Sequence, residues 1–268
     1  MFVQDHCDYV DINLGCPQRV AKRGNYGPFL MDNLPLIQSM VTELAKGLTM
    51  PVSCKFRIFP DLENTLAYAR MLEKARCSLP AVHRRTREQK DGRATRADWE
   101  AIKAVKEAVG IPVLANGNIR WLEDVHECMR RTGADGVMSA KSLLENPDLF
   151  GGQRIKAVED VRGSIEELSR EGAMNELALT LEYLDLCDKY SVTKKMIRAH
   201  VYKLLIAWFV RYPELPDELN GEQGAAIDWI RGLVYRLLQR HVQTSSASSL
   251  LVELDSHFVL SLHSSSAQ

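Results

Sequence analysis

Residues 8–17 read DYVDINLGCP, and this stretch decides the fold class. Apolar side chains recur at every second position and share one face of a predicted strand, whereas Asp11 and Asn13 share the other face. The Gly-Cys-Pro sequence then ends the strand, because proline has no amide donor and glycine permits a sharp change of direction. In folds that alternate strands and helices, the loop after a strand's carboxyl end lines the active site.

Four more β-rich runs follow, and each precedes a stretch with helical periodicity. Together with the first, the five runs lie at 8–15, 51–58, 78–83, 111–119 and 134–140. This alternation predicts a parallel sheet with crossover helices. A closed barrel needs eight βα units, so the pattern leaves two alternatives: an open sheet, or a barrel from whose front three units are missing.

The β runs stop near residue 165, and three helical segments follow near 173–190, 193–211 and 222–240. They predict a second, all-helical domain. We expect a partial barrel over 1–155 and the helical domain over 165–242. The Ser-rich tail, 243–268, is expected to be poorly ordered because of its serines, and its one apolar run, LLVELDSHFVLSL, is either an extra strand, an isoform-specific end or without a role.

Composition excludes several classes of protein. Apolar residues make up 46% and charged residues 26%, which is typical of a folded globular chain. The net charge of −1 excludes an overall basic field for nucleic acid, so an RNA site must be a local patch. The six cysteines form no C-x-x-C pair, and no segment has the pattern expected of a signal peptide or a membrane span. We expect reduced thiols and a cytoplasmic or nuclear location.

Three side chains near the predicted strand ends are candidates for chemistry. Cys16 follows the first strand, although a lone cysteine is more often a small buried hydrophobe. Lys55 and Arg57 lie on the interior face of the second strand, where unpaired charge is costly. They indicate either an anionic ligand or an edge strand whose polar face is solvated.

The later strand ends add weaker signals. His83 closes the third strand, and a lone histidine there is by itself more often structural than catalytic. The basic loop 84–96 is either a solvated charge run or a contact for a phosphate backbone. The sequences ANGN (115–118) and MSAK (138–141) close the last two strands, where loops with free N–H groups commonly hold a phosphate.

The twenty residues DINLGCPQRVAKRGNYGPFL (11–30) resemble the signature of tRNA-dihydrouridine synthases, particularly the eukaryotic branch that acts on positions 16 and 17 of the D-loop. KFR (55–57) and ANGN resemble further motifs of that family. Two departures stand out: Arg84 replaces the glycine of the family's H-G-R-T motif, and Ala140-Lys141 stands where many members have Gly-Arg. The resemblance covers about residues 3–240.

This resemblance implies an α/β fold of the (β/α)8 TIM-barrel type, incomplete because its first three or so βα units are missing, plus a C-terminal all-helical domain. It implies FMN as cofactor, NADPH as reductant and tRNA as partner, with no metal and no membrane; we favour a monomer. The implied catalytic acid is Cys16. The implied cofactor-binding residues are Lys55, His83, Asn116, Gly117, Asn118, Ala140 and Lys141, and the implied substrate-binding residues are Asn13, Lys22, Arg57 and Arg85.

The reaction expected from this resemblance is the reduction of uridine to dihydrouridine in tRNA. Two alternatives stay open. The chain could be a catalytically inert short form that keeps RNA binding, or a flavin-barrel reductase of small molecules.

Overall fold

The computed structural model describes residues 4–89, 99–151, 170–221 and 227–244. Contacts divide the chain into two units. One comprises Met1–Ser142 with Leu149–Gly152, and the other comprises Leu143–Asp148 with Gln153–Gln268. We describe each unit by itself.

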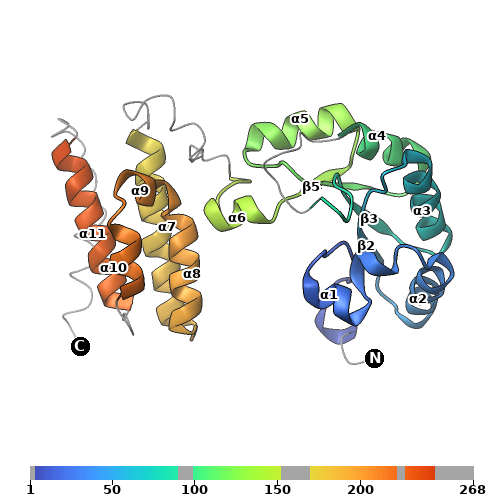
Figure 1. Cartoon of the computed structure of the whole chain (residues 1–268), viewed down its shortest axis with the longest axis horizontal. Coiled ribbons are helices and arrows are strands. Elements are labelled where there is room, and N and C mark those ends of the chain that lie inside the picture. Colours follow the sequence, from blue (N-terminus) through green and yellow to red (C-terminus); the bar gives the residue numbers. More distant parts are fainter. Residues whose placement is uncertain (1–3, 90–98, 152–169, 222–226, 245–268) are drawn as a thin grey trace. The chain divides into compact units, whose positions relative to one another are not determined.

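The first unit is built on a five-stranded parallel sheet (Figure 1). Its strands are β1 (Val10–Leu14), β2 (Val52–Arg57), β3 (Leu79–His83), β4 (Leu114–Asn116) and β5 (Gly136–Met138). They pair in sequence order, and every pair is parallel. The predicted βα rhythm is therefore confirmed, with shorter strands than the sequence runs. An eight-stranded barrel with three absent units goes beyond these five strands and stays a prediction.

Helices α2–α5 form an arc along one side of the strands (Figure 1). The helical elements are η1 (Gln4–His6), α1 (Arg19–Gly24), η2 (Gly27–Leu30), α2 (Leu34–Gly47), α3 (Leu62–Lys74), α4 (Trp99–Ala108) and α5 (Leu122–Thr132). A short helix, α6 (Lys141–Glu145), begins in this unit and ends in the other. The Phe56 ring of β2 packs on Tyr68 of α3, with ring centroids 5.1 Å apart. The apolar face of the sheet is thus buried under helices, which leaves the polar face for other contacts.

Local sequence explains where the helices begin and end. The Asn33 side chain accepts a hydrogen bond from the amide of Leu36 and caps α2, and Asp61 does the same for Glu63 at the start of α3. Gly133 ends α5 in the left-handed conformation, at φ 67°. These caps fix where each crossover returns to the sheet.

Pro80 lies inside β3, opposite Cys54, although proline is unfavourable in a central strand. The ladder is maintained around it. The amide of Ser78 donates to the carbonyl of Val52 at 2.8 Å, and the pairing of β3 with β4 begins one residue later, at Ala81. The strand therefore tolerates the missing donor.

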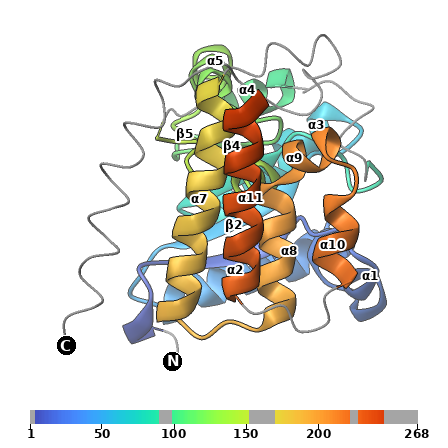
Figure 2. The same ribbon diagram turned by 90° about the vertical axis from the view of Figure 1, so that its left-hand side faces the viewer.

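The second unit is helical, and its long helices α7, α8 and α11 run lengthwise in Figure 2. Its helices are α7 (Arg170–Lys189), α8 (Lys194–Leu204), α9 (Ile206–Arg211), α10 (Leu215–Gly221) and α11 (Ile227–Thr244). Their shared core includes Leu177, Leu184, Val201, Leu205, Trp208, Leu233 and Leu237.

The helices of this unit differ from the sequence prediction in two ways. The helix expected over 193–211 is interrupted at Leu205, whose backbone (φ −97°, ψ 17°) leaves the helical conformation. The short helix α10 was not predicted, because its seven residues are too few to show a period. Of the predicted Ser-rich tail, 245–268 lie outside the described residues, as do 90–98 of the basic loop.

Candidate functional site

The parallel register brings polar side chains to one face and one end of the sheet. Arg57, His83, Asn116 and Met138 form a row across four strands at their carboxyl ends. Lys55 lies one pleat earlier, opposite Asn13 of β1 and on the same face. The register therefore brings Lys55, His83 and Asn116 of the predicted cofactor-binding residues to one face of the sheet, and that they form a cofactor site stays a prediction.

Cys16 is presented by a turn that the Asn13 side chain stabilises. The Asn13 Oδ1 accepts hydrogen bonds from the amides of Gly15 and Cys16, both at 3.1 Å. Gly15 passes close to β2, since a Cβ there would lie 3.3 Å from the carbonyl oxygen of Lys55. Cys16 itself is half-buried. The turn therefore holds the backbone directly before Cys16 against the second strand.

The surroundings of Cys16 are cationic. Burial lowers the pKa of the Lys55 ammonium, and the charge of Arg57 lowers it further, whereas Asp11 and Cys16 act in the opposite direction. Burial also lowers the pKa of Arg57, and Cys16 again opposes the change. Cys16 is thus within electrostatic reach of two cationic side chains.

His83 is held neutral. Burial is the main cause, and the charges of Arg57, Lys55, Arg85 and Arg84 add to it, so that the pKa of His83 falls to about 3. Its Nδ1 is buried without a hydrogen-bond partner among the described residues. A neutral imidazole can donate or accept one hydrogen bond, so His83 suits a ligand with a polar ring atom.

The loop after β4 is shaped by Arg84, an outcome that the sequence did not predict. Arg84 is only 2% exposed and its guanidinium donates to the Asn118 side chain. Gly117 adopts φ 118°, a conformation that favours glycine, and Asn118 is left-handed at φ 58°. The Arg85 guanidinium also reaches Asn118, at 3.4 Å. The backbone sequence Gly-Asn is therefore packed against two arginine side chains.

The loops after β4 and β5 lie next to each other. The Asn116 Nδ2 donates to the carbonyl of Met138 at 2.7 Å, and the Ser139 hydroxyl donates to the carbonyl of Ile119 at 2.9 Å. Ala140 and Lys141 follow β5 and are exposed. The predicted phosphate-binding residues are thus on adjacent loops. The side-chain amide of Asn116, however, already bonds to β5.

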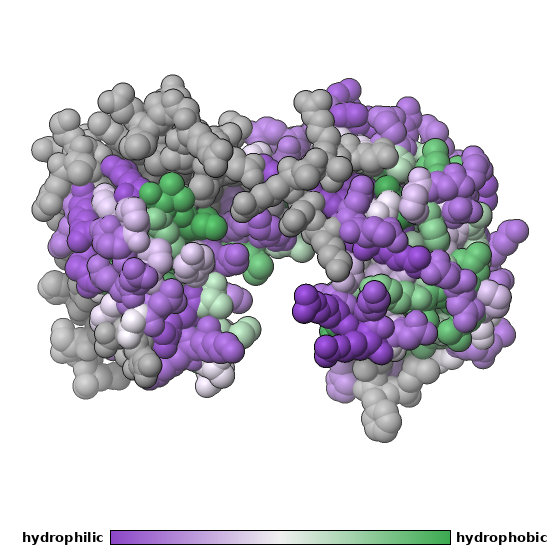
Figure 3. Space-filling view, in the orientation of Figure 1, coloured by the Kyte–Doolittle hydropathy of each residue, from purple (hydrophilic) through white to green (hydrophobic). Residues whose placement is uncertain are grey.

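The predicted substrate-binding cations differ from one another. Lys22 is exposed on α1, which follows Cys16 closely and also carries Arg19 and Arg23. Figure 3 shows strongly hydrophilic side chains over this helix. Arg57, by contrast, is 7% exposed and its guanidinium donates to backbone carbonyls. Lys22 is therefore placed to meet a polyanion at the surface, whereas Arg57 is engaged within the protein.

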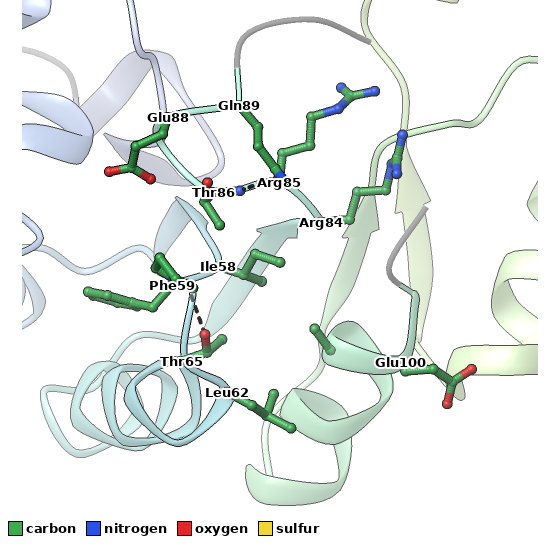
Figure 4. Close-up of a pocket in the computed structure, with 12 residues that line it drawn as sticks. Ile58, Phe59, Leu62, Thr65, Arg84, Arg85, Thr86, Glu88, Gln89 and Glu100 are labelled. Carbon is green, nitrogen blue, oxygen red and sulfur yellow. Dashed lines mark hydrogen bonds between the residues drawn. The ribbon is translucent and has the colours of Figure 1, made fainter. Parts of the chain in front are cut away.

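A cavity of about 740 Å³ lies near the carboxyl ends of β2 and β3 (Figure 4). Its lining includes Ile58, Leu62 and Ala101 together with Arg84 and Arg85. Ile58 belongs to the helix-covered face by strand alternation, so the cavity lies between α3 and α4 and not on the polar face. Of the predicted site residues, only Arg85 lines it. The polar face is therefore the better candidate for chemistry, since it holds Lys55 and His83 and the Cys16 turn begins from its Asn13 side chain.

The helical unit has a second group of cations, on α8. Lys195, Arg198 and Lys203 form no ion pair with any acidic residue of the described chain, and Tyr202 is 37% exposed among them. The arginines of α11 are neutralised instead: Arg231 pairs with Asp185 and Asp188, Arg236 with Glu218, and Arg240 with Glu214. Among the described residues, α8 therefore combines several cations that have no acidic partner with an exposed aromatic side chain, Tyr202.

No helix of the described ranges contains a segment long and apolar enough to cross a membrane. Within the same ranges, no three His, Cys, Asp or Glu side chains are grouped so that they could hold a metal ion. All six cysteines are free thiols.

Comparison with known proteins shows to which family the chain belongs. The model of the family described as "Dihydrouridine synthase (Dus)" matches residues 1–204. A Rattus norvegicus protein, "tRNA-dihydrouridine(16/17) synthase [NAD(P)(+)]-like", is 46% identical over 219 residues, which cover 82% of this chain and 46% of the rat protein. The Saccharomyces cerevisiae "tRNA-dihydrouridine(16/17) synthase [NAD(P)(+)]" is 36% identical over 219 residues, 81% of this chain and 50% of the yeast protein.

A Homo sapiens protein, "tRNA-dihydrouridine(20a/20b) synthase [NAD(P)+]-like", is 41% identical over 152 residues, 54% of this chain and 47% of the human protein. The chain spans about half the length of these relatives. Likeness to solved structures is weak: a putative phosphonomutase from Burkholderia cenocepacia is 12% identical and covers 52% of this chain and 72% of its own, with a TM-score of 0.35.

Proposed function

The chain belongs to the dihydrouridine synthase family, and from this premise we propose that it reduces uridine to dihydrouridine in the D-loop of tRNA, with FMN as cofactor and NADPH as reductant. The observation that carries the proposal is the arrangement of Cys16, Lys55 and His83 on one polar face at the carboxyl end of a parallel sheet. A thiol, a cation and a neutral imidazole at one edge suit a reaction that adds hydride and a proton to a base.

The residues present fit FMN. The buried Nδ1 of His83 lacks a partner among the described residues and suits a polar ring atom of the flavin. Lys55 faces the same side and suits an anionic ring edge. The adjacent loops with Gly117, Asn118, Ala140 and Lys141 would hold the phosphate. When bound, FMN would supply the hydride, which no amino-acid side chain can donate.

Cys16 is the proposed general acid. Reduction of the C5–C6 bond of uracil needs one hydride and one proton, and the Sγ of Cys16 would give the proton to C5. A thiol carries one S–H proton that it can donate, so Cys16 has the chemistry for this role.

Recognition of tRNA is proposed to use two cationic surfaces. The first is α1, with Lys22 exposed beside the Cys16 turn, and Arg85 extends it from the β3 loop. The second is the face of α8 that carries Lys195, Arg198 and Tyr202, three residues that a helix brings to one side. Phosphate contacts and base stacking are the interactions that such side chains offer to RNA. The target base must leave the stack to reach Cys16.

The experiment measures flavin binding first and turnover second. Purified full chain is titrated with FMN and followed by flavin fluorescence, and then incubated with FMN, NADPH and unmodified tRNA. We expect saturable binding and NADPH-dependent dihydrouridine in the D-loop by mass spectrometry. Flavin binding and NADPH oxidation that proceed without any change in the tRNA would instead indicate a reductase of small molecules.

One observation favours a second function, a catalytically inert chain that binds RNA. Arg84, which stands where the family motif has glycine, lies against Gly117 in the cradle proposed for the flavin. Its volume would compete with a ligand that approaches the backbone closely. Binding of tRNA without saturable binding of FMN would support this alternative over the reductase.

A further inference from the structure

We propose that Arg57 is a positioning residue that fixes the Cys16 turn, and that it does not contact the substrate. The inference rests on the proposed function, in which Cys16 is the acid. It differs from the role that the sequence motif implies, which is contact with the substrate. In this role Arg57 keeps the proton donor, Cys16, in a fixed position.

The contacts of Arg57 are with backbone carbonyls on two different loops. Its Nε donates to the carbonyl of Gly15 at 2.7 Å, directly before Cys16. Its Nη1 donates to the carbonyls of Thr86 and Gln89, at 2.9 and 3.1 Å. Arg57 is 7% exposed, so these bonds are shielded from water. The side chain therefore joins the loop after β1 to the loop after β3.

This bridge completes the hydrogen bonding of the Gly15 backbone. The amide of Gly15 donates to the Asn13 Oδ1, and its carbonyl accepts from Arg57. The donor and the acceptor of the residue before Cys16 are thus both held by side chains of neighbouring strands. Backbone at the start of a surface turn is free to move unless such bonds fix it.

Only arginine can make this bridge. Its planar guanidinium presents donors in a rigid fork, so Nε and Nη1 reach carbonyls in two directions at once. A lysine at the same position would carry the same charge, but its single ammonium cannot satisfy both loops. If Arg57 served as a cation for the substrate, lysine would retain much of the function. The two roles therefore predict different results for Arg57→Lys.

The first test measures how accessible Cys16 is. Wild type, Arg57→Lys and Arg87→Lys are treated with iodoacetamide, and modification of Cys16 is followed by peptide mass spectrometry. Arg87 is the matched control: it lies in the same β3 loop and bonds to Asp32 and Pro28, but not to Gly15. We expect alkylation about tenfold faster in Arg57→Lys, the change that losing one charge-assisted hydrogen bond produces, and no change in Arg87→Lys.

This test uses no FMN, NADPH or tRNA, so its outcome is independent of the proposed activity. Equal alkylation rates in wild type and Arg57→Lys would overturn the proposal. So would equal acceleration in both variants, since the general stability of the loop would then control Cys16. If Arg57→Lys and a second variant, Arg57→Gln, both lose the circular dichroism of the folded chain, Arg57 supports the whole unit and the local role is wrong.

The second test separates positioning from binding. In dihydrouridine formation, Arg57→Lys should lower kcat by about 100-fold, the effect of a small misplacement of a catalytic group, while KM for tRNA stays near that of wild type. A raised KM with unchanged kcat and unchanged alkylation would show that Arg57 contacts the substrate.

Discussion

The side chain of Arg84 packs across Gly117 so closely that a Cβ on Gly117 would lie 2.9 Å from Cγ and 3.0 Å from Cδ of Arg84. Gly117 also has φ 118°, which side chains rarely adopt. Close contact and backbone conformation thus both require glycine at this position.

We expect Gly117→Ala to destabilise the first unit by about 1–3 kcal/mol, the usual cost of strained backbone, and by more if Arg84 cannot move. Urea unfolding measures the change. Gly110→Ala is the control, because its Cβ would meet only Glu73 at 3.4 Å. The double variant Arg84→Ala/Gly117→Ala should recover part of the loss, since it relieves the contact but not the backbone strain. Full recovery would mean that the positive φ costs nothing.

The buried imidazole of His83 should make the first unit sensitive to acid. Its pKa in the folded chain is about 3, below the ordinary value of 6.5, so the unfolded chain binds the proton more readily. The neutral His83 imidazole therefore makes its full contribution to stability above pH 6.5, and this contribution is lost as pH falls toward 3. His83→Gln should flatten the dependence of unfolding free energy on pH in this window. The exposed His126→Gln should leave the slope as in wild type; a similar flattening there would remove the special role of His83.

Glu176 of α7 should give the opposite pH dependence, so that its contribution to stability falls as pH rises. It is 3% exposed, and burial raises its pKa to about 8, although Trp208 lowers it somewhat. The folded chain then holds the proton more tightly than the unfolded chain, so the contribution to stability is full below pH 4.5 and is lost as pH rises to 8. Glu176→Gln should raise the unfolding free energy at pH 8 by about 2 kcal/mol or more, and little at pH 4.5. Equal effects at both pH values would show that Glu176 does not titrate in this range.

The sequence predicted features that depend on neighbouring residues, but not contacts between residues far apart in the chain. Strand alternation placed Lys55 on the polar face, and the βα rhythm gave the parallel order, because both are repeated at short range. The partners of Arg57 and Arg84 could not be predicted. They are backbone carbonyls and an amide some thirty to forty residues away, and only the fold of the loops brings them together.

The interruption at Leu205 has a similar explanation. The apolar residues of 193–211 keep a helical period across it, so periodicity predicts one helix. Leu205 is fully buried in the core shared with Leu177 and Leu233, and packing there determines where the chain turns. Tertiary contacts therefore decided a boundary that the local pattern did not show.

The contrast between α8 and α11 predicts which helix binds RNA. Lys195→Gln/Arg198→Gln and Arg231→Gln/Arg236→Gln each remove two positive charges. The first pair should weaken tRNA binding and reduce its salt dependence by about one unit of slope per phosphate contact. The second pair should mainly lower stability, because those arginines are already neutralised by acidic partners. Filter binding at several salt concentrations measures both. Equal loss of affinity would mean that overall charge, and not the α8 face, determines binding.

The final prediction concerns Cys16 itself. Cys16→Ala should still bind FMN and tRNA, because the thiol adds little to binding and the turn is held by Asn13 and Arg57 through backbone groups. Dihydrouridine formation should fall by about 10²–10⁴-fold, the usual contribution of a general acid, with a remainder if water supplies the proton. Flavin reduction by NADPH should persist, since that half-reaction does not use the thiol.

Single-turnover assays separate these steps for Cys16→Ala: flavin absorbance follows the reduction by NADPH, and mass spectrometry of the tRNA follows dihydrouridine. Cys7→Ala is the matched control, since Cys7 is an exposed thiol of the same unit. It should behave as wild type in both steps. Loss of flavin binding in Cys16→Ala would make Cys16 a structural residue, because deleting an acid alone removes only help in the transition state. Unchanged turnover would mean that another group protonates C5. Lys55 is then a donor to test, because it lies on the same polar face and its pKa responds to Cys16.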